Sequence, residues 1–325
     1  IAEGGERYRT VEQDHVTVYR GDARMVGERE VEVALEAGGS ERITADHVVL
    51  AAGARPHIPD IVRESGVAYD TSDTIMRIDE VPRHLIVLGG GYIGAELGNV
   101  FGMFGSHISI VNRGDCLLRW EDPEISSRFT AAYAAKFDLR LNAKLLEVAD
   151  HPDGIAVTID REGDVDTIVG DRLLVATGRT PNGHQLDVAA GGVELDDRGY
   201  VVTDEYLRTA APGVWALGDI TNPAQLKHTA NAEARVVAHN IAHPDDLRAI
   251  DRRFSPSAVF GHPQVASVGL NEPEAIASGR EITVAVRSYG ATAYGWAMED
   301  TTSVCKLIAD VDSRRLLGAH IIGPQ

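Results

Sequence analysis

Short runs in which polar and apolar residues alternate occupy the first part of the chain. His15–Tyr19 and Val31–Leu35 alternate with a period of two, which predicts antiparallel strands joined by turns, one of them at Gly38-Gly39. Four later apolar runs each end on a glycine motif or lead directly into one, and they predict buried strands; they span residues 48–53, 84–88, 173–178 and 214–219.

The run at His84–Leu88 begins a larger unit. A glycine-rich segment at 89–94 follows it, then a helical pattern from about Ala95 to Phe104, then a further strand at His107–Val111. Strand, helix and strand within about 30 residues form a βαβ unit, so the local sheet should be parallel. The remaining pattern predicts helices at 124–136, 227–242 and 272–278, and strands at 139–168, with a turn at Asp153-Gly154, and from about 253.

Composition narrows the class of protein. The chain has 325 residues, 44% hydrophobic and 25% charged, which suits roughly two globular domains. No apolar run approaches the roughly 18 residues of a membrane span, and the net charge of −18 argues against nucleic acid or an anionic membrane as partner. The two cysteines, Cys116 and Cys305, form neither a disulfide framework nor a zinc-site spacing, so we expect a cytoplasmic protein without a metal.

The segment Gly89-x-Gly91-x-x-Gly94 has the spacing of a dinucleotide-binding loop and lies between a predicted strand and a predicted helix. Gly89 permits the tight turn, Gly91 lets the backbone approach a pyrophosphate, and Gly94 lets the helix pack closely on the strand. The helix N-terminus attracts the phosphate charge. We predict a dinucleotide site here, with Tyr92 and Ile93 among its residues; the alternative is a purely structural βα turn.

The end of the next strand indicates which dinucleotide binds. An NAD site usually places an acidic residue there for the ribose hydroxyls, but this strand ends Val111-Asn112-Arg113, and Arg119 lies six residues on. Arginine offers the planar, permanently charged fork that a phosphate favours, so we predict NADPH. The alternative is that both arginines are ordinary surface charges and that Asp115 reaches a ribose.

Four motifs in a fixed order carry a family resemblance. They are Ala51-Ala52-Gly53-Ala54-Arg55-Pro56, the glycine segment 89–98, Ala176-Thr177-Gly178-Arg179-Thr180-Pro181-Asn182, and Ala216-Leu217-Gly218-Asp219. Essentially the whole chain resembles the pyridine nucleotide–disulfide oxidoreductases, relatives of glutathione reductase. The resemblance implies an α/β fold: a partial, discontinuous FAD-binding Rossmann-like domain at 1–81 and 206–252, an inserted NADPH-binding Rossmann domain at 82–205, and a truncated α+β dimerisation domain at 253–325.

The resemblance also assigns cofactor contacts. Asp219 matches the aspartate that binds the flavin ribityl chain, and Arg179 resembles the arginine near the NADPH ribose and pyrophosphate. Tyr92 resembles the aromatic gate over the flavin, and Glu96 the glutamate that pairs with a lysine beside it. The start of the helix facing the flavin pyrimidine matches Lys227, His228, Thr229 and Ala230, and the motif glycines Gly53, Gly178 and Gly218 complete the predicted cofactor contacts.

The chain also departs from the family pattern. It has no second, N-terminal Gly-x-Gly-x-x-Gly, no Cys-x4-Cys, and no histidine base after the dimerisation strands, which His262 precedes. We therefore interpret the chain as an internal segment in which no catalytic residue is assigned. We expect that it would not by itself reduce a disulfide. The same departures put the family's homodimer in doubt here.

The function that follows is a FAD-dependent NADPH:disulfide oxidoreductase. The stretch Ala293–Thr301 most resembles the branch of the family that reduces mycothione, the disulfide of mycothiol. The alternatives are another branch, of mercuric reductase, dihydrolipoamide dehydrogenase or soluble transhydrogenase type, or a non-catalytic NADPH-binding module. A flavoenzyme without a protein disulfide, such as a ferredoxin reductase, is a further option.

Overall fold

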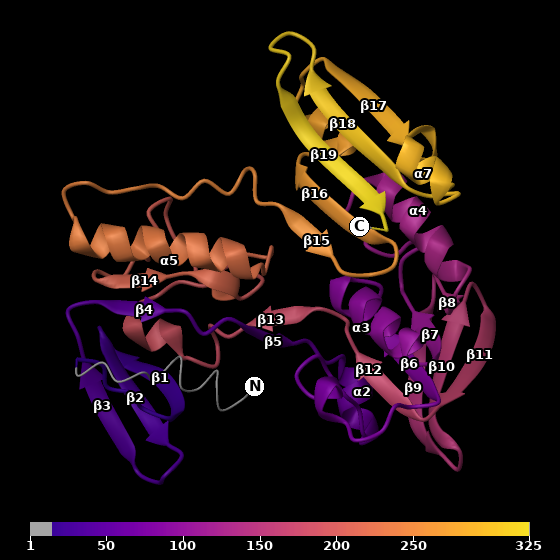
Figure 1. Ribbon diagram of the computed structural model, residues 1–325. Coiled ribbons are helices and arrows are strands. Elements are labelled where there is room, and N and C mark those ends of the chain that lie inside the picture. The colour runs from indigo at the N-terminus through magenta and orange to yellow at the C-terminus, as the bar shows by residue number, and fades with distance from the viewer. Residues whose placement is uncertain (1–14, 325) are drawn as a thin grey trace. The chain divides into compact units, whose positions relative to one another are not determined.

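The computed structural model describes residues 15–324 and divides into two compact units (Figure 1). The first unit contains the described residues up to Arg55 together with Pro181–Ile250, and the second contains Pro56–Thr180 together with the residues from Asp251 onward. The chain therefore passes from one unit to the other three times. Short strands lie at two of these crossings, β5 (Ala54–Pro56) and β13 (Arg179–Pro181).

A four-stranded parallel sheet forms the centre of the second unit. Its order is β12-β6-β7-β8, and the strands span β6 (His84–Leu88), β7 (His107–Val111), β8 (Asp138–Arg140) and β12 (Arg172–Val175). Successive residues of β6 point to opposite faces, since Leu85 and Val87 belong to one buried cluster and Ile86 and Leu88 to another. Both faces of the sheet are covered, which explains the continuously apolar run in the sequence.

Helices cover one face and an antiparallel sheet the other. The helices are α3 (Tyr92–Met103) and α4 (Pro123–Ala134). The antiparallel strands are β9 (Lys144–His151), β10 (Gly154–Arg161) and β11 (Asp164–Gly170). The helix α2 (Asp60–Ser65) and the short 3-10 helix η1 (Ile75–Arg77) precede β6 in the chain. The predicted parallel βαβ unit is confirmed. Its helix begins at Tyr92, three residues earlier than predicted, because Gly91 serves as the N-cap.

The last part of the second unit is a five-stranded antiparallel sheet of order β15-β16-β19-β18-β17. It buries Val259, Val265, Val304 and Ile322 in the same cluster as helices α3 and α4. The elements of this region are β15 (Ser257–Val259), β16 (Gln264–Gly269), α6 (Glu272–Ala277), β17 (Ile282–Ser288), η4 (Tyr289–Ala291), α7 (Ala293–Ala297), β18 (Val304–Asp310) and β19 (Leu316–Gly323).

The first unit combines an antiparallel three-stranded sheet, a parallel strand pair and a long helix. The parallel pair joins Val48–Leu50 to Val214–Ala216, and it buries Leu50, Val214 and Ala216 in one core. The elements are β1 (Gly21–Gly27), β2 (Glu30–Leu35), β3 (Ser40–Thr44), β4 (Val48–Leu50), η2 (Val188–Gly191), β14 (Val214–Ala216), η3 (Gly218–Ile220) and α5 (Lys227–Ala242).

One strand prediction in the first unit is wrong. His15–Tyr19 forms no strand, and the first strand of the described residues is Gly21–Gly27. Val16 and Val18 are each 53% exposed, so the alternation there reflects no buried face. Alternation predicts a strand only where one face is packed, and the second run, at Val31–Leu35, meets that condition with Val33 5% exposed.

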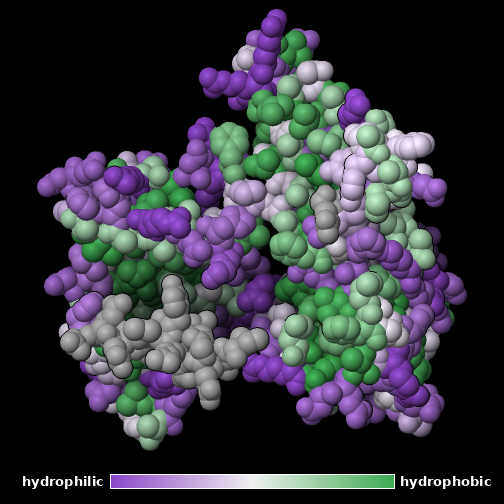
Figure 2. All heavy atoms as spheres, in the orientation of Figure 1, coloured by the Kyte–Doolittle hydropathy of each residue, from purple (hydrophilic) through white to green (hydrophobic). Residues whose placement is uncertain are grey.

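Figure 2 shows hydrophilic residues over most of the visible face of each unit, with hydrophobic residues in smaller areas between them. Within residues 15–324 no helix combines the length and apolar character that a membrane crossing requires. The two compact units differ from the predicted domains, since residues 56–81 belong to the second unit with the β6 sheet, and residues 181–205 belong to the first unit. The three-domain division stays a prediction.

Candidate functional site

Close backbone contacts shape the loop after β6. Gly89 has a φ of +112°, and a Cβ there would lie 2.2 Å from the carbonyl oxygen of Ala176. A Cβ on Gly94 would lie 2.1 Å from the carbonyl oxygen of Gly89. Only glycine fits at either position, so α3 starts in direct contact with the loop.

Gly91 faces open space instead. A Cβ there would meet no atom within 4 Å, and no side chain of the described residues caps the N-terminus of α3. The first N–H groups of this 12-residue helix, at the positive end of its dipole, are therefore available beside the loop. This arrangement fits a pyrophosphate, the group predicted for this position.

The carboxyl ends of three neighbouring strands meet at this loop. β6 lies between β7 and β12, so the strand order reverses there, and ligands of open α/β sheets bind at such switch points. β6 leads into Gly89, β7 into Arg113 and β12 into Gly178, whose surroundings are open. Arg179, which follows at the start of β13, is half-buried. The structure thus brings Gly89, Arg113, Gly178 and Arg179, all predicted cofactor contacts, to one edge of one sheet.

Asn112 connects the glycine loop to the segment that carries the arginines. Its Oδ1 accepts from the Gly90 N–H at 3.2 Å, and its Nδ2 donates to the Cys116 carbonyl at 2.8 Å. The Leu118 N–H donates to the Gly90 carbonyl at 2.8 Å. Sequence reasoning noted only that Asn112 is not acidic. The signal available was a polar amide directly after a buried strand.

Arg113 and Arg119 are both exposed, as a phosphate-binding pair must be. The Arg119 guanidinium carbon lies 4.3 Å from the centroid of the Trp120 ring, and Trp120 is itself 68% exposed. A cation over an aromatic face is held in a preferred orientation. Asp115, which in the alternative interpretation reaches a ribose, is also exposed.

Tyr92 and Glu96 lie on the first two turns of α3. Tyr92 is half-buried against the core, and this burial raises the pKa of its hydroxyl, with a further contribution from the charge of Glu121. Glu96 accepts a hydrogen bond from the Phe260 N–H at 2.9 Å. The lysine partner predicted for Glu96 has no match in the chain, and this backbone contact occupies one of its oxygens.

In the first unit, a buried glutamate holds the Gly218-Asp219 motif. Glu233 of α5 is 0% exposed and accepts from the Gly218 N–H at 2.6 Å and from Asn222 Nδ2 at 3.0 Å. Gly218 has a φ of +78° and lies two residues after β14, the strand that pairs with β4. Asp219 is half-buried in η3. Sequence reasoning missed Glu233, although it falls on the buried face of α5 with Thr229 and Val237.

The predicted flavin-facing residues occupy the first turn of α5. Lys227 and His228 are exposed, Thr229 is buried and Ala230 is half-buried. The N-cap residue, Leu226, makes no side-chain capping hydrogen bond to this helix. Its positive dipole end therefore suits the negative charge that develops on a reduced flavin.

Asn182 links Gly53 to the neighbouring motif. The Asn182 N–H donates to the Gly53 carbonyl at 3.1 Å, and its Nδ2 donates to the Ala52 carbonyl at 2.9 Å. Arg55 in turn donates to Asn182 Oδ1 at 3.0 Å. Gly53 has a φ of +66° with open space around its Cα. Two of the four motifs that carried the family resemblance are thus joined in space.

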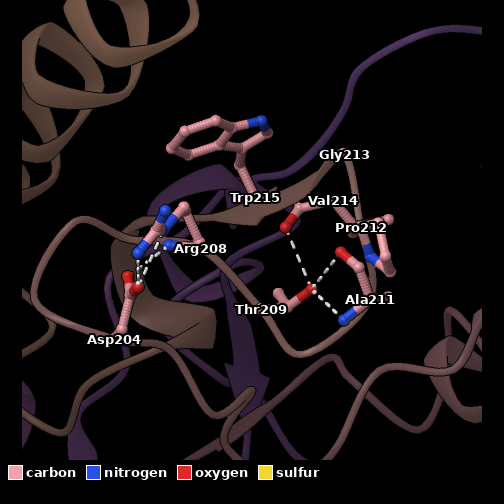
Figure 3. A pocket seen from close by; sticks show the side chains of 8 residues that line it. All are labelled: Asp204, Arg208, Thr209, Ala211, Pro212, Gly213, Val214 and Trp215. Atoms are coloured by element: carbon pink, nitrogen blue, oxygen red, sulfur yellow. Dashed lines mark hydrogen bonds and ion pairs between the residues drawn. The ribbon is translucent and has the colours of Figure 1, made fainter. Parts of the chain in front are cut away.

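A pocket of about 380 Å³ lies elsewhere in the first unit, around Trp215 (Figure 3). Its polar groups pair with one another: Thr209 Oγ1 donates to the Val214 carbonyl at 2.9 Å, and Arg208 forms a 2.8 Å ion pair with Asp204. None of the predicted site residues lines it. The pocket therefore does not mark the cofactor site.

Cys116 and Cys305 are both free and half-buried. Across the part of the chain that the structure describes, no group of three or more histidine, cysteine or acidic residues is placed to hold a metal ion.

Comparison with known proteins identifies the family. Residues 2–235 match the pyridine nucleotide-disulphide oxidoreductase family, and residues 255–325 match its dimerisation domain. The chain belongs to this family. The predicted enzyme class, the fold class and the cofactors FAD and NADPH are confirmed.

Relatives and solved structures agree with this membership. The chain is 45% identical over 330 residues to mycothione reductase of Mycobacterium tuberculosis, covering 100% of this chain and 71% of that protein. It is 32% identical to mercuric reductase of Staphylococcus aureus, covering 96% and 56%. The HOCl-induced flavoprotein disulfide reductase RclA of Escherichia coli matches with a TM-score of 0.82 at 29% identity, covering 94% of this chain and 69% of that chain.

The family is one of FAD-dependent disulfide oxidoreductases, and the non-catalytic module is not favoured. The match to the dimerisation domain supports a homodimer acting on a disulfide substrate.

Proposed function

We propose that the protein reduces mycothione in the cytoplasm, with NADPH as electron donor and FAD as carrier. The observation that carries this proposal is the 45% identity to mycothione reductase of Mycobacterium tuberculosis over the whole chain. The geometry supports the nucleotide half of the proposal, because the glycine loop and two exposed arginines lie at one sheet edge.

In the proposed NADPH site, the Gly91 backbone and the N-terminus of α3 bind the pyrophosphate through N–H groups. Arg113 and Arg119 bind the 2′-phosphate with charge-assisted hydrogen bonds. Arg179, which begins β13 shortly after the carboxyl end of β12, binds near the adjoining ribose. Asn112 holds the arginine segment against the glycine loop, so the distance between the two phosphate sites is set before NADPH arrives.

In the proposed flavin site, Asp219 accepts hydrogen bonds from ribityl hydroxyls, and the N-terminus of α5 stabilises negative charge at the pyrimidine end. FAD, when bound, accepts hydride from the nicotinamide and passes the electrons onward. The 16-residue length of α5 and the apolar N-cap residue Leu226, which makes no capping hydrogen bond, support this assignment.

The substrate is tested by comparing acceptors in the protein that carries this chain. NADPH oxidation is followed at saturating NADPH with mycothione, oxidised lipoamide, glutathione disulfide or mercuric ion as the acceptor. We expect mycothione to give the highest kcat/KM by at least tenfold. A higher kcat/KM with lipoamide or mercuric ion would overturn the substrate assignment while leaving the NADPH assignment standing.

A further inference from the structure

In the segment between β7 and α4, residues 117–122 are buried at both ends and exposed in the middle. Leu117 and Leu118 are 0% and 1% exposed, and Glu121 and Asp122 are 6% and 0% exposed. Between these buried pairs, Arg119 and Trp120 both project into solvent. A segment held at both ends and exposed in the middle presents its exposed residues in one orientation. The anchors therefore decide where Arg119 points.

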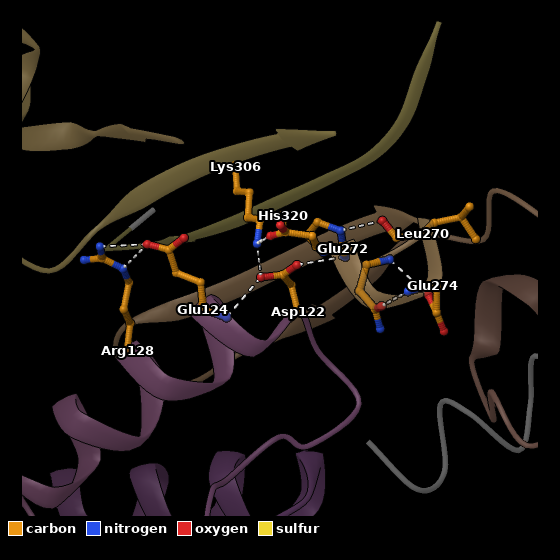
Figure 4. Close-up of polar contacts among 9 residues, drawn as sticks. Asp122, Glu124, Arg128, Leu270, Glu272, Glu274, Lys306 and His320 are labelled. Atoms are coloured by element: carbon orange, nitrogen blue, oxygen red, sulfur yellow. Dashed lines mark hydrogen bonds and ion pairs between the residues drawn. The ribbon is translucent and has the colours of Figure 1, made fainter. Parts of the chain in front are cut away.

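The anchor after Trp120 is a buried ion cluster that joins α4 to the dimerisation domain (Figure 4). Lys306 of β18, whose side chain is 4% exposed, lies 2.8 Å from Asp122 Oδ1 and 2.6 Å from Glu272 Oε2. Asp122 also accepts from the Glu124 N–H at 3.0 Å, as the N-cap of α4, and from the Glu272 N–H at 3.1 Å.

Both central charges of this cluster persist at neutral pH. Burial lowers the pKa of Lys306, but its hydrogen bonds to Asp122 and Glu272 leave that pKa above the ordinary value. Burial likewise raises the pKa of Asp122, but the hydrogen bond from Lys306 leaves that pKa below the ordinary value. Removing one partner of a buried pair leaves an uncompensated charge, so Lys306 and Asp122 depend on each other.

We propose that Lys306 is a positioning residue for NADPH: from the dimerisation domain it fixes Asp122, and thereby the segment that presents Arg119 to the 2′-phosphate. This inference rests on the proposed role of Arg113 and Arg119. The role of Lys306 is indirect, since it acts through its hydrogen bond to Asp122, which lies 184 positions away in sequence. The dimerisation domain thus contributes to nucleotide selection as well as to assembly.

The chain offers a matched control. Lys136, just after α4, donates from its Nζ to the His262 carbonyl at 2.6 Å. It therefore also connects α4 to the region after residue 250, but at the opposite end of the helix from Arg119. Lys136→Met removes a lysine contact between α4 and this region, here an exposed hydrogen bond to a backbone carbonyl, without touching the nucleotide segment.

The test measures binding of 2′,5′-ADP and of 5′-AMP, which differ in the 2′-phosphate and need no flavin. We expect Lys306→Met to raise the Kd for 2′,5′-ADP about tenfold, the loss of one charge-assisted contact, and to leave the Kd for 5′-AMP within about twofold. Lys136→Met should leave both Kd values within about twofold.

A second variant keeps the test decisive if Lys306→Met fails to fold. Lys306→Met combined with Asp122→Asn leaves no buried uncompensated charge at this pair, while the asparagine can still cap α4. We expect it to fold, by circular dichroism and thermal melting, and still to lose affinity for 2′,5′-ADP selectively. Wild-type affinity in this folded double variant would overturn the inference, as would equal losses for both ligands.

The wild-type protein separates this inference from the proposed function. If it binds 2′,5′-ADP no more tightly than 5′-AMP, the NADPH role of the arginines fails, and the inference fails with it. If it prefers 2′,5′-ADP and the folded Lys306 variants keep that preference, only the inference fails.

Discussion

The two predicted nucleotide-binding regions of this molecule are built in opposite ways. In the second unit, glycines make the site, since a Cβ at Gly89 or Gly94 would collide with a backbone carbonyl. In the first unit a side chain makes it, since buried Glu233 receives the N–H of Gly218 and the amide of Asn222. The comparison teaches that a region formed by close backbone approach is disrupted by an added side-chain atom. A region held by a buried carboxylate is disrupted instead by removal of that carboxylate.

The sharpest test of this contrast is Gly94→Ala. The new Cβ would lie 2.1 Å from the Gly89 carbonyl oxygen, so the helix must move away from the loop. We expect the free energy of unfolding of this unit to fall by roughly 3 kcal/mol, and binding of 2′,5′-ADP to be lost. Urea unfolding and calorimetric titration measure the two effects.

Gly98→Ala, in the same helix, is the matched control. Its Cβ would lie 3.6 Å from the nearest atoms, which is ordinary contact, and alanine favours a helix over glycine by up to about 1 kcal/mol. The control should therefore be neutral or slightly stabilising. If both variants behaved alike, close approach at Gly94 would not be the property that matters.

Glu233→Ala tests the other half of the comparison. It leaves the Gly218 N–H and the Asn222 amide without their acceptor, at a cost of about 2–3 kcal/mol in the first unit. We expect a lower melting temperature and weaker flavin retention, measured by absorbance after gel filtration. Glu233→Gln keeps one acceptor oxygen and should lose less. Unchanged 2′,5′-ADP binding in both variants would show that the two regions are held independently, and a parallel loss would refute that independence.

Arg113→Ala combined with Arg119→Ala separates the glycine loop from the arginines within one site. The pyrophosphate contacts remain, so NADH binding should change less than about twofold. The Kd for NADPH should rise roughly 30-fold or more, through the loss of two charge-assisted contacts. Fluorescence titration with each nucleotide provides the measurement. Equal losses for NADPH and NADH would contradict the assignment.

The smallest expected effect belongs to Trp120→Ala. Loss of the stacking between the Arg119 guanidinium and the indole should raise the Kd for NADPH about two- to fivefold, the size of an exposed cation–π contact. Trp296→Ala is the control, because Trp296 is 77% exposed on α7 with no role in the nucleotide segment. If the two tryptophan variants gave the same Kd, the stacking would not orient Arg119.

Pattern reasoning predicted the elements around the nucleotide loop well. β6 and β7 have the predicted bounds, as does α5 at residues 227–242; the two strands are buried apart from their first residues, and α5 buries one face. It failed at His15–Tyr19, where alternation occurs without a packed face. Local pattern reports which residues could form an element, but only neighbouring elements decide whether the apolar face is covered.

The residues that hold the site together were less visible. Asn112 reaches Gly90 across 22 positions, Glu233 reaches Gly218 across 15, and Lys306 reaches Asp122 across 184. Each is a polar residue whose structural role is a hydrogen bond to a residue distant in sequence. No periodicity or spacing records such a pairing.

By itself, the sequence determined the family, the cofactor class and the glycines at which the backbone turns, because these depend on short motifs whose chemistry is local. Only the tertiary structure decided what supports them: the edge where three strand ends meet, the buried Glu233 behind Gly218, and the Lys306 cluster behind Arg119. The physical reason is that a buried polar group must find its partner in space. Which partner it finds depends on how distant segments pack.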